Sequence, residues 1–115
     1  MIKRLSSKYE KVSDNFFIRK KDSFQKVGGA KRVKIKGFEE FDFILHKVNK
    51  KSLKFWQISE GITGLKIPKM FKSPVKAIKH AESYLAEKGV EVTELRIIER
   101  VDEYSLSPRY KFKNK

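Results

Sequence analysis

The chain has 115 residues, no cysteine and a formal net charge of +14, from 28 Lys and Arg against 14 Asp and Glu. Its length suits one domain over residues 1–115, and the lack of cysteine excludes disulfides and thiolate metal sites. A chain without cysteine also fits a cytoplasmic setting, and we expect a cytoplasmic protein. No apolar run reaches the roughly 18 residues of a membrane span, and no apolar segment follows the charged N-terminus as in a signal peptide.

The first residues are polar and only weakly patterned. Tyr9, Val12 and Phe16 are at helical spacing, which indicates a short helix near the N-terminus. The last residues, RYKFKNK, are basic with interleaved aromatics. We expect both ends, residues 1–14 and 106–115, to be flexible basic termini.

The densest basic run covers residues 16–36. Within it Val33 and Ile35 alternate with cations, the period-two pattern of a half-buried strand with one aliphatic and one cationic face. Gly28-Gly29 breaks the run and predicts a turn. These glycines are no phosphate-binding loop, because the Gly-Lys-Ser/Thr ending of such a loop is missing.

A hairpin is predicted next. Phe41, Phe43 and Leu45 share one face of a strand whose other face also carries apolar residues, so this strand is expected to be central or covered on both sides. The polar turn 49–52 leads to a return strand over 53–59. After the glycine-containing turn 60–64, Leu65 and Ile67 predict a third short strand that ends at Pro68.

The clearest helix signals lie between residues 73 and 89. Ser73 is a suitable N-cap, Pro74 occupies the first helical position and Gly89 follows the last turn. A helix is therefore predicted over about 74–88. Its apolar stripe is expected to comprise Ala77, Ile78, Ala81, Tyr84 and Leu85, with Val75 buried at its edge.

Two interpretations stand for the chain after Gly89. Val90 and Val92 alternate like a strand, and then Leu95, Ile98 and Val101 recur at helical spacing, with Thr93 as an N-cap. We favour a second helix near 94–104, and a strand through Ile97-Ile98 is the alternative. Residues 82–103 hold seven of the acids, so charge is polarised along the chain.

These elements predict an α+β fold, in which a small antiparallel sheet of three to five strands is covered by one main helix. The order of three antiparallel strands and then an alanine-rich helix, over residues 38–89, is loosely similar to small DNA-binding domains that lay a sheet in the major groove, such as integrase arm-binding domains. No diagnostic motif of such families is present, and no residue role is carried over from them.

The sequence offers little for catalysis. His46 and His80 have no ligand-type residues at metal-site spacing, so each is expected to be exposed or packed, and we expect no metal and no cofactor. Glu39, Glu40 and Asp42 could hold a cation, but we favour a solvated strand start or pairing with neighbouring lysines. No nucleophile motif is present, and we expect a protein that is not an enzyme.

The cations are more informative, because binding to a phosphate backbone needs several of them on one connected face. The candidates lie on the strand 31–36, at the hairpin turn and in the acid-free run before and within the helix. They are Lys31, Arg32, Lys34, Lys36, Lys50, Lys51, Lys54, Lys66, Lys69, Lys72 and Lys76. The candidates for stacking on bases are Phe55, Tyr110 and Phe112.

Two functions from different classes follow from these residues. The first is non-catalytic nucleic-acid binding, to DNA rather than RNA, in what could be an accessory protein of a phage or mobile element. The alternative is an adaptor or inhibitor that docks on an acidic protein partner such as a nucleic-acid enzyme. A structural subunit of a larger assembly, or simply the lysine-rich bias of a genome, would leave the same composition. No membrane partner is expected, and the sequence leaves the oligomeric state open.

Overall fold

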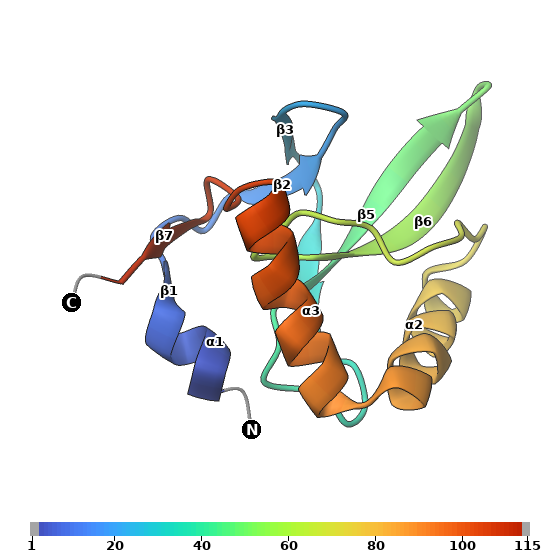
Figure 1. The fold of residues 1–115 in the computed structure, drawn as a ribbon. Coiled ribbons are helices and arrows are strands. Elements are labelled where there is room, and N and C mark those ends of the chain that lie inside the picture. Colours follow the sequence, from blue (N-terminus) through green and yellow to red (C-terminus); the bar gives the residue numbers. More distant parts are fainter. Residues whose placement is uncertain (1–2, 114–115) are drawn as a thin grey trace.

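A computed structural model describes residues 3–113 of the chain, so residues 1, 2, 114 and 115 of the predicted termini lie outside it. The fold is α+β, as the sequence predicts (Figure 1). In chain order the elements are α1 (Lys3–Lys8), β1 (Tyr9–Lys11), β2 (Phe16–Arg19), β3 (Phe24–Val27), β4 (Lys31–Val33), β5 (Phe43–Lys50), β6 (Leu53–Glu60), α2 (Pro74–Lys88), α3 (Val90–Glu103) and β7 (Tyr110–Phe112). None of the described helices is long and apolar enough to cross a membrane.

The main sheet is antiparallel, with strand order β4-β5-β6. The central strand β5 is buried on both faces over its first half, which confirms the expectation from its two apolar faces. Phe43 and Leu45 point to the core beside Ile58 of β6, while His46 lies on the opposite face and its Nε2 is 2.7 Å from the Oγ of Ser59. Burial lowers the pKa of His46, and it is a packed histidine.

The predicted third strand over residues 65–67 is reduced to single bridges. Lys66 forms an isolated bridge with Ser59, and Phe71 forms another with Trp56. Between them the chain cannot pair continuously with β6, because Pro68 has no backbone N–H to donate. The segment still follows the edge of β6, held there by Ile67 N–H bonded to the Ile58 carbonyl at 2.8 Å.

Helix α2 has the predicted bounds and caps. The Oγ of Ser73 accepts a bond from Lys76 N, Pro74 opens the helix and Gly89 closes it with φ of 86°. The predicted stripe is confirmed at its centre, where Ala77, Ala81 and Leu85 are buried. The prediction that Val75 is buried is wrong. Val75 is 60% exposed, because it lies off the side of the first helical turn that meets the sheet.

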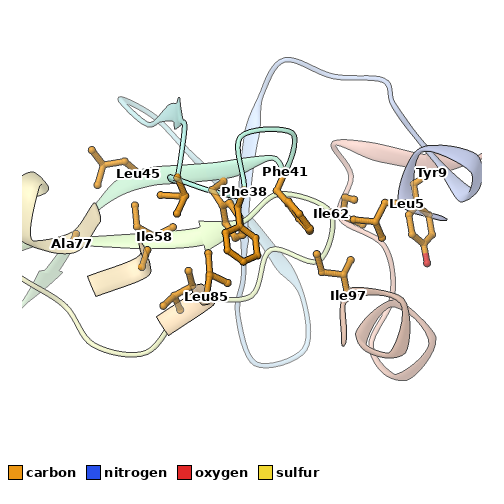
Figure 2. Close-up of a cluster of buried hydrophobic side chains, with 14 of the residues drawn as sticks. Leu5, Tyr9, Phe38, Phe41, Leu45, Ile58, Ile62, Ala77, Leu85 and Ile97 are labelled. Atoms are coloured by element: carbon orange, nitrogen blue, oxygen red, sulfur yellow. The ribbon is translucent and has the colours of Figure 1, made fainter. Parts of the chain in front are cut away.

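A continuous core joins the helices to the sheet. Figure 2 shows it running from Ala77 and Ile58 at one end to Leu5 and Tyr9 at the other. Small side chains on α2 allow the helix backbone to approach β6 closely, and Ala81 is completely buried.

Replacing Ala81 by Leu should therefore overpack this contact and lower the free energy of unfolding by about 1–3 kcal/mol. Urea denaturation at fixed pH measures the loss. Ala86→Leu, at an exposed position of the same helix, is the matched control and should change stability little. An equal effect of the two substitutions would contradict the close packing of α2 on the sheet.

Helix α3 confirms the predicted second helix but begins earlier than expected. Val90 and Val92, predicted to alternate as a strand, form its first turn. The reason is that Gly89 ends one helix and begins the next, since its N–H donates to Leu85 O and its carbonyl accepts from Thr93 N. Thr93 is therefore no N-cap: it lies inside α3, and its hydroxyl donates to Gly89 O at 2.8 Å.

The buried side of α3 also differs from the prediction. Ile97 and Val101 are buried in the core, four residues apart, whereas Leu95 is 44% exposed. Of the predicted stripe, Val101 is confirmed as buried and Ile98 is half-buried against the core, while Thr93 and Ile97 lie on the buried side in place of Leu95.

The two smaller sheets tie the ends of the chain to the rest. Strand β1 pairs antiparallel with β7, and β2 pairs with β3 as a separate hairpin whose Arg19 N–H donates to Gly64 O. Within the predicted flexible termini 1–14 and 106–115, Leu5, Tyr9 and Arg109 are buried. The described part of both termini thus contributes to the core. The N-terminal helix lies at Lys3–Lys8, before the spacing at Tyr9, Val12 and Phe16 that indicated it.

Candidate nucleic-acid interface

The distal half of the β5–β6 hairpin extends beyond the body of the molecule, away from α1 and β7 (Figure 1). Its two strands stay paired to the last position, Lys50 opposite Leu53. Lys51 and Ser52 connect them with φ of 51° and 65°, the left-handed pair of a tight two-residue hairpin loop. The predicted hairpin is confirmed, with a shorter loop than the four residues expected.

Four lysines cover this projection, and no acid lies between Asp42 and Glu60. Lys47, Lys50, Lys51 and Lys54 are all exposed. Register places Lys47 and Lys54 on one face of the ribbon and Lys50 on the other, because residues paired across the strands share a face. Both faces of the hairpin tip are therefore cationic.

The acid-free run 61–81 lies directly beside the hairpin. Phe71 exchanges both backbone hydrogen bonds with Trp56, and the Gln57 side chain donates to Ile67 O at 3.0 Å, so the run is attached to the outer edge of β6. Its predicted site residues Lys66, Lys69, Lys72 and Lys76 are exposed. The structure thus brings two of the predicted cationic groups, the hairpin tip and this run, into one neighbourhood.

The third cationic group lies elsewhere. Lys31 and Arg32 are on β4, at the opposite edge of the sheet from the run 61–81, and Lys34 and Lys36 follow β4 in the next loop. Arg32 is already engaged: its guanidinium lies 3.4 Å from Asp42 and donates to the carbonyls of Glu39 and Phe41. This group therefore does not join the surface formed by the hairpin and the run.

The predicted stacking residues are also separated. Phe55 is half-buried on the hairpin beside Val48, next to the lysines. Phe112 is 59% exposed, but it lies on β7 against the ring of Tyr9, at the far end of the molecule. Tyr110 is held by a hydrogen bond from its hydroxyl to Asp42 at 2.8 Å. Burial and the Asp42 charge raise the pKa of Tyr110, so its hydroxyl stays protonated and bonded.

Asp42 corrects the interpretation of the carboxylates at 39–42. It is not a solvated strand start but the centre of a buried polar cluster, where Arg109 donates to it through Nε at 2.8 Å and through Nη2 at 3.3 Å. Gly61 packs so closely against it that a Cβ would lie 2.1 Å from its Oδ2. The cluster lines a cavity of about 270 Å³ with Tyr9, Arg32 and Glu60.

The charged groups at the centre of this cavity, Asp42, Arg109 and Glu60, already have hydrogen-bond partners. Arg109 also donates to the carbonyls of Ser13 and Asn15, and Glu60 accepts from the backbone N–H groups of Ile62 and Thr63. No group of three or more His, Asp or Glu side chains within residues 3–113 could hold a metal ion. The cluster therefore serves to join the C-terminal strand to the sheet, and the cationic surface is the better candidate for a binding site.

An aromatic row beside this surface was not predicted from the sequence. Rings of Trp56, Phe71, His80 and Tyr84 follow one another from β6 through the run 61–81 to α2, with the His80 ring 5.1 Å from Phe71 and 6.0 Å from Tyr84. The signal in the sequence was the four-residue spacing of His80 and Tyr84. It was overlooked because Tyr84 was placed in the core stripe and His80 outside it.

Comparisons with protein-family models, with curated proteins and with solved structures found no match to this chain.

Proposed function

We propose that the protein binds DNA, without catalysis, through the hairpin tip of residues 47–54 and the adjoining run 61–81. The observation that carries the proposal is the attachment of one to the other at Trp56 and Phe71. Together residues 43–81 carry nine lysines and one acid, Glu60. That acid is buried, and burial raises its pKa to about 7, so it does little to offset the positive charge.

The shape of the hairpin supports a duplex target. A two-stranded ribbon fits the major groove of B-DNA, which is about 12 Å wide. With Lys47 and Lys54 on one face and Lys50 on the other, a hairpin that enters the groove tip first would present a cation to each flanking phosphate backbone. Within the described residues none of these lysines forms an ion pair, so none needs to leave a carboxylate in order to bind.

The proposal predicts a salt dependence that follows the hairpin charges. If about five phosphates are neutralised, log affinity for a duplex should fall with log salt at a slope of about −4.5. The double variant Lys50→Gln with Lys54→Gln removes two of these contacts, so the slope should become shallower by about 1.8 and the affinity at about 100 mM salt should fall about tenfold or more. Fluorescence anisotropy over a salt series measures both.

The matched control is Lys8→Gln with Lys113→Gln, which removes the same charge at the β1–β7 end of the molecule. Its slope should stay close to that of the wild type. Equal losses in both variants would show that net charge, and not the hairpin, determines binding. If the wild-type protein fails to bind duplex even at low salt, the proposal is wrong, and a pull-down that survives nuclease treatment would then favour an acidic protein partner.

A further inference from the structure

The aromatic row has cations at both ends. The Nζ of Lys47 lies 5.4 Å from the ring centroid of Trp56, and the Nζ of Lys88 lies 4.8 Å from that of Tyr84. Trp56, Phe71, His80 and Tyr84 are each half-buried, and Trp56, Phe71 and Tyr84 pack against the edge of the core. The residues of the row therefore follow the outer boundary between β6 and α2.

The helix contributes a regular face to this row. Lys76, His80, Tyr84 and Lys88 are spaced four residues apart, which places them on one side of α2. The buried residues Ala77, Ala81 and Leu85 lie next to this side and hold the helix against the sheet. Among residues 3–113 the Nε2 of His80 is a buried side-chain atom without a hydrogen-bond partner. The row therefore carries an unused polar group in addition to its ring surfaces.

The row leads into a cleft between α2, α3 and residues 63–68. Tyr84 and Lys88 line it, its walls include Phe43 and Ile97, and Arg96 and Tyr104 are also at its surface. Its volume is about 380 Å³, within the range of about 300–1,000 Å³ that is usual for small-ligand sites. An apolar cavity of this size beside the row could receive a planar ring from a ligand.

The charges around the cleft favour an anion. Lys66, Lys88 and Arg96 form no ion pair within the described residues, and Arg100 is paired with Glu103. The one carboxylate that lines the cleft is Glu60, which is buried and already accepts from the Thr63 N–H and hydroxyl. A ligand with negative groups spaced along a chain of flat rings would match both the cations and the aromatic row.

We propose that the row and the cleft bind single-stranded nucleic acid, with bases against Trp56, Phe71 and Tyr84, one base in the cleft, and phosphates on Lys66, Lys76 and Lys88. This inference rests on the proposed function and extends it to unpaired bases. Stacking on aromatic side chains tolerates any base, because every base has a π-face. Paired bases keep those faces inside the duplex, so a duplex alone would leave the row unused.

The test compares strands that differ only in their bases. Anisotropy is measured with a thymidine strand of about 12 nucleotides, the matching uridine strand, and a base-free strand with the same phosphates. With bases on three rings, the thymidine strand should bind at least about a hundredfold more tightly than the base-free strand. Tyr84→Leu removes one of the three rings, so it should lower that preference about fivefold or more and leave base-free binding unchanged. The uridine strand distinguishes RNA from DNA as the target.

Two variants control for packing. Tyr84→Phe keeps the ring and should stay within about twofold of the wild type, whereas Phe112→Leu removes an exposed ring at the far end and should have no effect. If Tyr84→Leu does not fold, two measurements still test the inference. One is the ratio of wild-type affinities for the thymidine and base-free strands, and the other is Arg96→Gln, which should weaken binding to every strand. Equal wild-type affinity for the thymidine and base-free strands would overturn this inference alone. Failure to bind any strand or duplex at low salt would overturn the proposed function with it.

Discussion

Replacing Asp42 by Ala should lower the free energy of unfolding by about 3–5 kcal/mol, the cost of leaving a buried charge without its partner. The side chain of Arg109 is 3% exposed and that of Asp42 8%. Arg109 is held by two bonds to that carboxylate, and Tyr110 donates to the same group. Without Asp42 the guanidinium stays desolvated and unpaired. Urea denaturation near neutral pH measures the loss.

A double-mutant cycle measures the interaction energy between Asp42 and Arg109 apart from the other contacts of each side chain. Adding Arg109→Leu to Asp42→Ala removes the stranded charge, so the double variant should be more stable than the sum of the two single losses predicts. Asp14→Ala is the matched control: its ion pair with Lys11 is on the surface, where Asp14 is 98% exposed, and the loss should be small. Additive losses from Asp42 and Arg109 would mean that the two side chains act independently.

This ion pair also shows what the sequence could and could not predict. Sixty-seven residues separate Arg109 from Asp42, and no local pattern connects them. The tail around Arg109 has the composition of a flexible basic end. In the structure, however, the residues that follow Arg109 form strand β7, which pairs with β1. Pairing between distant strands is a tertiary property, and composition carries no information about it.

Predictions from short sequence patterns were correct for elements that depend on residues close together in the chain. Ser73, Pro74 and Gly89 fixed the ends of α2, and alternation on both sides of the turn at 49–52 fixed the hairpin. The same rules failed at Val90, because one glycine both ends α2 and accepts the first hydrogen bond of α3. A rule that looks for a separate N-cap then assigns the first turn of α3 to a strand.

The sequence predicted which residues are candidates for the interface, but not which of them lie together in the folded protein. Eleven cations were named from three separate stretches on the expectation that they converge. The structure unites the hairpin with the run 61–81 through Trp56 and Phe71 and leaves the β4 group at the other edge of the sheet. Charge density along the sequence identified the residues, but strand order determined which of them meet.

Glu60 should make the protein less stable as the pH rises from about 4.5 to about 7. Burial raises the pKa of this carboxyl from 4.5 to about 7 against the opposing bonds from Ile62 and Thr63. Between these values the folded state keeps a proton that the unfolded state has released. The free energy of unfolding therefore falls as the pH rises through this window, by about 3 kcal/mol in total, and levels off about one pH unit above the folded-state pKa.

The variant Glu60→Gln should remove that fall, because an amide has no proton to release. Urea denaturation at about pH 5, 6, 7 and 8 gives the profile, and the readout is the change with pH rather than the stability at any one pH. The absolute value is expected to differ, since the substitution turns one of the two oxygens that accept from Ile62 and Thr63 into an NH2 group, which only donates hydrogen bonds. Glu91→Gln, at an exposed position of α3, should keep the wild-type profile. A Glu60→Gln profile parallel to that of the wild type would show that another group titrates in this range.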